Sequence, residues 1–207
     1  MISPKVGLTT VSNKQKRFIL ASASPRRLEL LNRLGFFPHK ILYPDICEVS
    51  RKGELPRNYV TRMASEKSLT FSLGENDVLL AADTIVAVGR RIIGKPTSGS
   101  HAREILQLLS GRRHRVITGL VVRNENGNSS KVVQTVVRMK NLTAGEIEEY
   151  IATGDWQGKA GGYGIQGKAE QFIPWIRGSY SNVVGLPLYE ARNLLLSHGL
   201  KASSENA

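Results

Sequence analysis

The stretch "ILASASPRRLELLNRLG", residues 19–35, begins with the pattern of a β-strand and continues with that of an α-helix. The apolar run of "RFILA" (17–21) predicts the strand. Ser24 is a favoured N-cap residue, Pro25 suits the first helical position, and Gly35 is typical of a helix end. The buried side of this helix is expected to carry the leucines Leu28, Leu31 and Leu34. The stretch therefore predicts one strand–helix unit of an α/β protein.

Strand and helix patterns also alternate along the rest of the chain, which predicts an α/β fold with a mixed sheet. Further strands are expected near 40–44 and at 77–89, 114–124 and 131–142, and further helices at 57–73, 100–111, 143–154 and 185–199. The last two strands are expected to pair antiparallel across Asn126-Gly127, a favoured hairpin turn. In the helix 57–73, the predicted buried residues are Val60, Ala64 and Leu69.

The composition is that of an ordinary globular protein, with 41% hydrophobic and 22% charged residues among 207. One unit over residues 1–207 is expected, since no linker or internal repeat divides the chain. The longest apolar stretch, residues 78–89, is too short to span a membrane, and the N-terminus lacks the apolar run of a signal peptide. Together with a single cysteine, Cys47, these features predict a cytoplasmic protein.

The net charge is strongly positive, with 29 Lys and Arg against 17 Asp and Glu, or +12. Such an excess attracts anionic partners, which include nucleotides, nucleic acids and acidic membranes. The basic residues are spread along the chain, the densest cluster being "GRRHR" (111–115), and aromatic residues make up only 6%. Nucleic-acid binders concentrate basic residues in a stripe with exposed aromatics, so the pattern argues against nucleic acid. A solvated basic surface is the plainer alternative.

Two glycine-rich motifs match known nucleotide-binding patterns only in part. "GRRIIGK" (89–95) begins like a phosphate-binding P-loop, but Pro96 replaces the hydroxyl residue that would bind magnesium. This segment is better explained as a hairpin. "GYGIQG" (162–167) has the spacing of a dinucleotide fingerprint, but neither a strand before it nor a helix after it is predicted. The sequence therefore favours neither a P-loop protein nor a Rossmann enzyme.

The start of the first predicted helix suits an anion. The N–H groups of a first helical turn are unpaired and carry a partial positive charge. Ser24 adds a hydroxyl there, and Arg26 and Arg27 add guanidinium groups that bind phosphate oxygens. A capped helix that begins with surface arginines would show the same residues.

Asp83 stands in the middle of the apolar run 77–89, where a carboxylate must be paired, protonated or bound to a cation. Metal binding is one explanation; an ion pair with an arginine, or a position at the end of the strand, is another. Glu48 could supply a second carboxylate, although taken singly it reads as a loop acid. Lys67 and Lys95 taken singly read as surface lysines.

Taken together, the motifs of this chain resemble those of the Maf family. The segments "ILASASPRRLELL", "VTRMASEKS", "AADTIV", "GKP", "VITGLVV", "GKAGGYGIQG" and "GSYSNVVGLPLYE" occur in the family's order between residues 17 and 198. The resemblance implies an inosine-triphosphatase-like α/β fold, with a long mixed sheet, flanking helices and a cleft between two lobes. It also implies a nucleoside triphosphate pyrophosphatase, and "GKAGGYGIQG" is similar to the branch that hydrolyses dTTP and UTP.

The resemblance implies a role for each candidate residue. The family's proton acceptor matches Asp83, and its specificity positions match Arg26, Thr84 and Gln166. Its other polar cleft residues match Ser24, Arg27, Glu48, Lys67 and Lys95. A divalent cation, Mg²⁺ or Mn²⁺, is expected on Glu48 and Asp83. Many relatives have an aspartate where this chain has Gly158.

Two other functions remain open at this point. One is a Maf enzyme for another nucleotide, such as a modified pyrimidine nucleotide or 7-methyl-GTP. The other is a non-enzymatic protein that binds nucleic acid or a cell-division partner through its positive charge. The expected partner is a small-molecule nucleotide, with no membrane, and a homodimer is compatible with the sequence.

Overall fold

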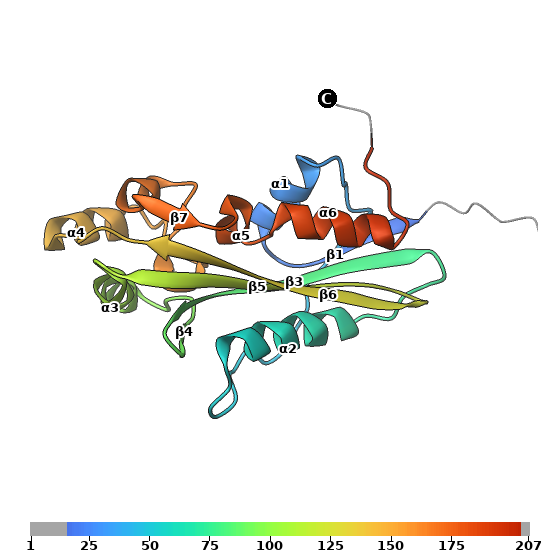
Figure 1. The fold of residues 1–207 in the computed structure, drawn as a ribbon, viewed down its shortest axis with the longest axis horizontal. Helices are drawn as coiled ribbons and strands as arrows, with labels where there is room; N and C mark the ends of the chain where they lie inside the picture. The colour runs from blue at the N-terminus through green and yellow to red at the C-terminus, as the bar shows by residue number, and fades with distance from the viewer. Residues whose placement is uncertain (1–15, 204–207) are drawn as a thin grey trace, which may run out of the picture.

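The computed structural model describes residues 16–203 and contains one seven-stranded sheet in the order β2-β1-β3-β5-β6-β7, with β4 paired to β3 (Figure 1). The strands are β1 (Arg17–Ala21), β2 (Lys40–Leu42), β3 (Asp77–Val88), β4 (Arg91–Ile93), β5 (Arg113–Asn124), β6 (Gly127–Arg138) and β7 (Trp175–Arg177). β1 runs parallel to β2 and β3, whereas every other pair is antiparallel. The predicted mixed sheet is confirmed. The predicted polar tails lie largely outside the described residues.

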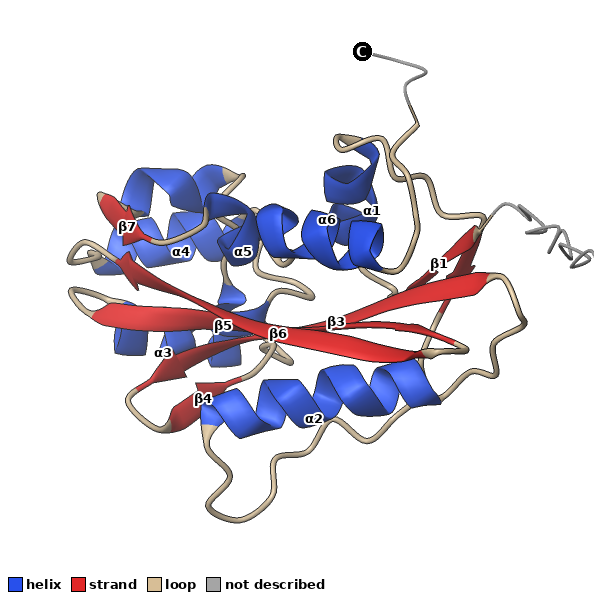
Figure 2. Ribbon diagram, turned by 45° about the vertical axis from the view of Figure 1, so that its right-hand side comes forward, coloured by secondary structure: helices blue, strands red, loops and turns tan. Residues whose placement is uncertain are grey.

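Helices cover both faces of this sheet. They are α1 (Pro25–Asn32), α2 (Pro56–Leu69), α3 (Gly99–Leu109), α4 (Ala144–Ala152), α5 (Tyr180–Val184) and α6 (Leu188–Ser197), with 3₁₀ helices η1 (Ala160–Gly162) and η2 (Lys168–Phe172). Figure 2 shows α1 and α6 on one side of the sheet and α2 on the other, while α3 and α4 lie toward the opposite end from α6. Within the described ranges, no helix is both long enough and apolar enough to cross a bilayer.

β3 is the central strand, and its two edges differ. β5 pairs with β3 from Leu79 to Ala87, along almost its whole length. On the other edge, β1 pairs only as far as Ala81, and β4 begins its pairing at Val86. Residues 82–85 thus have no paired strand on that edge in the described part of the chain. Within the described residues, the middle of this buried strand therefore lacks a neighbouring strand on one edge.

Both predicted hairpins form, but the turn of the second one lies at different residues from those expected. β3 and β4 form the hairpin that was expected in "GRRIIGK". β5 and β6 pair antiparallel as predicted, but Asn124 is paired with Gly127, so the loop consists of residues 125–126. The Asn124 side chain accepts a bond from the N–H of Asn126 at 3.0 Å, which favours this tighter turn. Gly127, at φ +145°, is therefore a strand residue.

Helix positions were predicted more accurately than helix faces. α2 buries Val60 and Ala64 as expected, but Leu69 is 63% exposed. The buried face continues three and four residues after Ala64, which leads to Lys67 and Ser68 instead. A lysine is therefore buried where an aliphatic residue was expected.

The first and last helices are shorter than the sequence suggested. α1 ends at Asn32, before Gly35, and it buries Leu30 in addition to Leu31. The helix expected over 185–199 is interrupted near Gly185, whose φ of +130° separates α5 from α6. Both glycines adopt conformations that other residues rarely reach. Glycine therefore marks the ends here and does not lie within the helices.

Candidate active site

A cleft of about 480 Å³ opens at the unpaired edge of β3 and is lined by all the residues that the sequence singled out. These are Ser24, Arg26, Arg27, Glu48, Lys67, Asp83, Thr84, Lys95 and Gln166. They come from the start of α1, a loop, α2, β3, the end of the β4 hairpin and the glycine-rich segment. The tertiary structure therefore collects residues that are up to 142 positions apart in the sequence.

The start of α1 faces this cleft. Ser24 occupies the N-cap position and Pro25 follows it, as predicted, but the Ser24 side chain makes no capping hydrogen bond. Its backbone N–H donates to Ser22 Oγ at 3.2 Å. Pro25 has no N–H and the Arg27 N–H donates to the Ser24 carbonyl at 3.2 Å, so the Ser24 hydroxyl and the arginine side chains are the main donors to an anion here.

Arg27 is held in place by three hydrogen bonds. Its Nε donates to the Gly185 carbonyl at 2.9 Å, its Nη1 to Ser22 Oγ at 2.9 Å, and its Nη2 to Thr84 Oγ1 at 3.1 Å. Burial lowers the pKa of Arg27, and the nearby Asp83 charge opposes this effect. A guanidinium remains charged at neutral pH even so. Arg27 thus provides a fixed positive charge at the N-terminus of α1.

Thr84 has a full set of protein partners. Its Oγ1 lies 2.9 Å from Thr118 Oγ1, donates to the Gly185 carbonyl at 3.2 Å and accepts from Arg27. The hydroxyl thus orients Arg27 in this structure. The specificity role that the resemblance implies for Thr84 stays a prediction.

Asp83 and Lys67 form the buried centre of the cleft. Asp83 is 6% exposed and lies in mid-strand, and Lys67 Nζ lies 2.6 Å from its Oδ1. Glu48 Oε1 lies 2.6 Å from the same nitrogen, and Lys95 Nζ lies 4.0 Å from Glu48 Oε2. The sequence left an arginine pair or a strand end as alternatives for Asp83. The structure shows a lysine pair instead, supplied by the buried face of α2.

The electrostatics of Glu48 favour its ionised form. Burial alone would raise the pKa of this carboxyl, but the hydrogen bond and charge of Lys67, with Lys95 and Arg27, lower it. Glu48 therefore stays a carboxylate at neutral pH. It presents negative charge next to Asp83, and Lys67 balances the pair.

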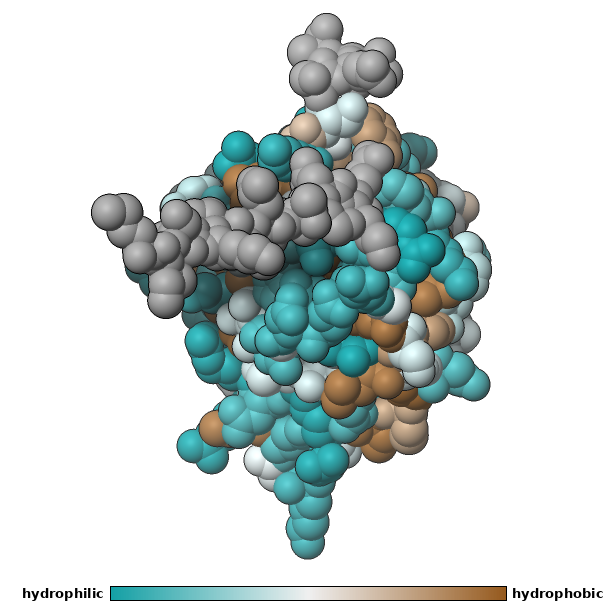
Figure 3. Space-filling view, turned by 90° about the vertical axis from the view of Figure 1, so that its right-hand side faces the viewer, coloured by the Kyte–Doolittle hydropathy of each residue, from teal (hydrophilic) through white to brown (hydrophobic). Residues whose placement is uncertain are grey.

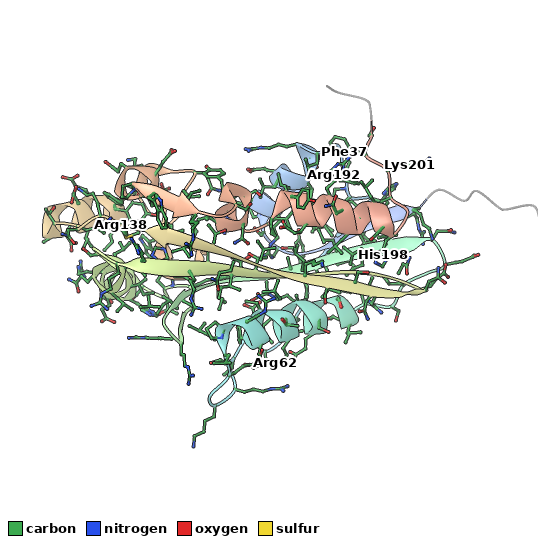
Figure 4. All side chains as sticks on the ribbon, viewed as in Figure 1. Phe37, Arg62, Arg138, Arg192, His198 and Lys201 are labelled. Carbon is green, nitrogen blue, oxygen red and sulfur yellow. The ribbon has the colours of Figure 1, made fainter. Side chains whose placement is uncertain are left out.

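The loop that carries Glu48 is tied to α2 by residues that the sequence analysis missed. Tyr59 Oη donates to the Glu48 carbonyl at 2.9 Å, and Arg62 Nη2 donates to the Val49 carbonyl at 3.1 Å. Arg62 also binds both oxygens of Glu54, at 2.7 and 2.6 Å. This hydrogen bond lowers the pKa of Glu54 to about 2. Figure 4 shows Arg62 on α2 beside this loop.

The glycine-rich segment forms the far wall. Arg26 Nη2 donates to the Gly158 carbonyl at 3.4 Å, so this position contributes its backbone to the wall. Lys159 also lines the cleft, and burial, then the charge of Arg26, lowers the pKa of its ammonium. A Cβ on Gly164 would lie 2.7 Å from Lys159 Cε, so the lysine stem packs directly against this glycine and would have to shift if a side chain were added. The sequence analysis did not single out Lys159.

Behind this wall lies a buried tyrosine–histidine pair. Tyr163 lines the cleft, and its Oη lies 2.6 Å from Nε2 of His114, which is 2% exposed. Burial lowers the pKa of His114 to about 4. His114 Nδ1 has no partner among the described residues. The sequence treated this histidine only as part of the basic cluster "GRRHR".

Comparisons with known proteins show which proteins this chain is similar to. A dTTP/UTP pyrophosphatase of Roseobacter denitrificans is 54% identical over 187 residues, which cover 90% of this chain and 100% of that protein. One of Cereibacter sphaeroides is 52% identical over 182 residues, covering 88% and 95%. Among solved structures, a HAM1 protein from Coxiella burnetii aligns with a TM-score of 0.47 and 17% identity, covering 88% of this chain and 100% of that one. The family described as Maf-like protein matches residues 17–198, and the chain therefore belongs to the Maf family.

Proposed function

We propose that this protein is a nucleoside triphosphate pyrophosphatase that hydrolyses dTTP and UTP to the monophosphate and pyrophosphate. The observation that carries the proposal is the cleft itself, where Asp83 and Glu48 face fixed cationic groups across one cavity. The names of the relatives support it, because proteins about half identical over nearly their whole length are dTTP/UTP pyrophosphatases. A nucleotide is thus the proposed partner and the cytoplasm the proposed location.

The cationic side of the cleft suits a triphosphate. Arg26, Arg27 and Lys95 line it together with the start of α1. Guanidinium groups bind phosphate oxygens in bidentate fashion, and a helix N-terminus offers backbone donors. Because Arg27 is already held by protein oxygens, little conformational freedom is lost when it meets a phosphate.

The acidic side suits a divalent cation, Mg²⁺ or Mn²⁺. Glu48 and Asp83 each have an oxygen 2.6 Å from Lys67 Nζ, so the two carboxylates meet at one place in the cleft and would supply the protein ligands of the ion. Residues 16–203 contain no group of three or more His, Cys, Asp or Glu that could hold a metal. Two carboxylates completed by substrate phosphates and water are nevertheless a usual Mg²⁺ arrangement. When bound, such an ion would neutralise negative charge that develops on pyrophosphate.

In the proposed reaction, Asp83 accepts the proton of the attacking water. The water oxygen forms a bond to the α-phosphorus, and the bond from that phosphorus to the bridging oxygen breaks. Lys67 and Lys95 bind phosphate oxygens and stabilise the charge of the leaving pyrophosphate. The position of Asp83 at the unpaired edge of β3, where it is buried and lines the cleft, supports this role.

Gln166 is the residue proposed to recognise the pyrimidine base. It lines the same cleft on the glycine-rich wall. A glutamine amide both donates and accepts hydrogen bonds, which matches the O2, N3–H and O4 edge shared by thymine and uracil. The far wall therefore serves the base and the α1 side serves the phosphates.

The test is hydrolysis of a nucleotide panel by the purified protein with Mg²⁺ or Mn²⁺, analysed by chromatography. We expect dTTP and UTP to give monophosphate and pyrophosphate, and chelation to abolish turnover. The panel includes modified pyrimidine nucleotides and 7-methyl-GTP. Release of diphosphate and orthophosphate, or faster turnover of 7-methyl-GTP than of dTTP, would contradict the proposal.

A further inference from the structure

The strand register brings together basic side chains that are scattered in the sequence. Six residues form two rows across β5, β6 and β7: Arg113–Arg138–Trp175 and Arg115–Val136–Arg177. Residues directly opposite on neighbouring strands share a face of the sheet, as do residues two apart on one strand. These six residues therefore lie on one face, which we call the arginine face.

Four of the six residues on the arginine face are exposed to solvent, and Arg115 and Val136 are half-buried. Trp175 is 40% exposed, and Arg113, Arg138 and Arg177 are exposed as well. The residues between the two rows point the other way into the core, namely His114, Val137 and Ile176. Figure 4 places Arg138 at the end of the sheet that lies away from His198. This end of the sheet is therefore covered on one face only.

The charges of the arginine face are not neutralised. None of its six positions carries an acidic residue, and none of its four arginines forms an ion pair with a described residue. Neighbouring Lys140 is paired with Glu146 at 2.5 Å and adds little net charge. The four arginines lie on three neighbouring strands, so their like charges repel one another, and an anion bound between them would relieve this repulsion.

An aromatic ring lies within this positive surface. The guanidinium carbon of Arg113 is 5.5 Å from the centroid of the Trp175 ring. Both residues line a hollow of about 590 Å³, together with Arg138, Lys140, Asn141 and Pro174. Exposed tryptophan rings and guanidinium planes are surfaces on which nucleobases stack.

From these observations we propose that the arginine face binds single-stranded nucleic acid, with phosphates on its arginine rows and a base against Trp175. A single-stranded nucleic acid uses every feature of this surface, since its phosphates meet the arginines and an unpaired base stacks on the ring. None of the six residues lines the cleft, so this surface is separate from the catalytic site. The sequence argued against nucleic acid because its basic residues form no continuous stripe. In the folded sheet, the register of β5, β6 and β7 aligns four arginines into such a stripe.

The test is binding of a labelled oligothymidylate of about 12 nucleotides, followed by fluorescence anisotropy at several salt concentrations. We expect log K to fall with log salt with a slope of about −3 for four arginine contacts. Arg113→Ala with Arg138→Ala should reduce that slope by about 1.4. Trp175→Ala should weaken binding about tenfold, whereas Trp175→Phe should retain most of it.

The matched control removes two exposed arginines from the other end of the molecule, Arg33→Ala with Arg192→Ala. Figure 4 places Arg192 on α6, and Figure 3 shows that end of the molecule with hydrophilic side chains over much of it. Equal weakening by this control would overturn the proposal, since net charge alone would then explain binding. Displacement of the oligonucleotide by dTTP, equal affinity for anionic vesicles without dependence on Trp175, or no binding at all would overturn it as well.

Discussion

The cleft and the arginine face both carry arginines, but the charged groups of the cleft have protein partners, whereas those of the arginine face have no carboxylate partner among the described residues. In the cleft, Lys67 contacts two carboxylates and Arg27 donates to three oxygens. On the arginine face, no described carboxylate pairs with the four guanidinium groups. Arg113, Arg138 and Arg177 are exposed, and Arg115 is half-buried and donates to the Gly89 carbonyl. Paired charges are held in one geometry, which positions reacting groups. Unpaired like charges at the surface attract an incoming anion, which favours binding without chemistry.

The largest effect that this comparison predicts is on Asp83. Asp83→Asn keeps the shape and a hydrogen-bond acceptor for Lys67 but no longer accepts a proton at neutral pH. We expect kcat for dTTP to fall about 10²-fold to 10⁴-fold, the usual range for a positioned acid–base group. Asp77→Asn is the control, since Asp77 lies on the same strand but pairs with Arg17 outside the cleft. An Asp83→Asn enzyme with most of its turnover would remove Asp83 from the mechanism.

A second prediction concerns His114, which separates the arginine face from the cleft wall. Its pKa is about 4 in the folded chain and near 6.5 when unfolded. Between these values the unfolded chain binds the extra proton, so the free energy of unfolding falls as pH drops from about 6.5 to 4. The full loss amounts to about 3 kcal/mol.

Urea unfolding at several pH values measures this loss. His114→Gln is the control, because glutamine is polar and does not titrate. Carboxylates titrate in the same pH range in both proteins, so the difference between the two curves isolates the histidine. Parallel curves would show that His114 is not buried in its neutral form.

The third prediction tests the bonds that hold the Glu48 loop. Arg62→Ala removes the bonds to Glu54 and to the Val49 carbonyl. We expect kcat/KM to fall about tenfold, the scale of one lost charge-assisted bond, and half-maximal activity to need more Mg²⁺. Arg57→Ala is matched to it, because Arg57 is exposed on the same helix. An unchanged Mg²⁺ requirement would mean that the loop is held without Arg62.

The smallest effect is expected when the arginine face is altered and hydrolysis is measured. Arg113→Ala with Arg138→Ala should change kcat/KM for dTTP by less than about twofold, as for other exposed substitutions. Loss of turnover well beyond this would show that the two surfaces are coupled. The arginine face would then contribute to catalysis as well as to binding.

The sequence predicted most of the strands and helices and the nine candidate residues that line the cleft. The apolar run of β3 and the Ser24-Pro25 start of α1 were confirmed because both signals are local. The face of α2 was predicted wrongly at Leu69, since an aliphatic residue carries no information on which side a partner strand lies. Lys159, His114 and Arg62 were missed because their roles depend on contacts with distant segments.

The sequence by itself determined the order of strands and helices and the family motifs that name the cleft residues. Only the tertiary structure decided that Lys67 is the partner of Asp83 and that the arginines of β5, β6 and β7 form one face. The physical reason is that propensity and capping act within a few residues along the chain. Ion pairs and strand register act between segments that meet only when the sheet closes.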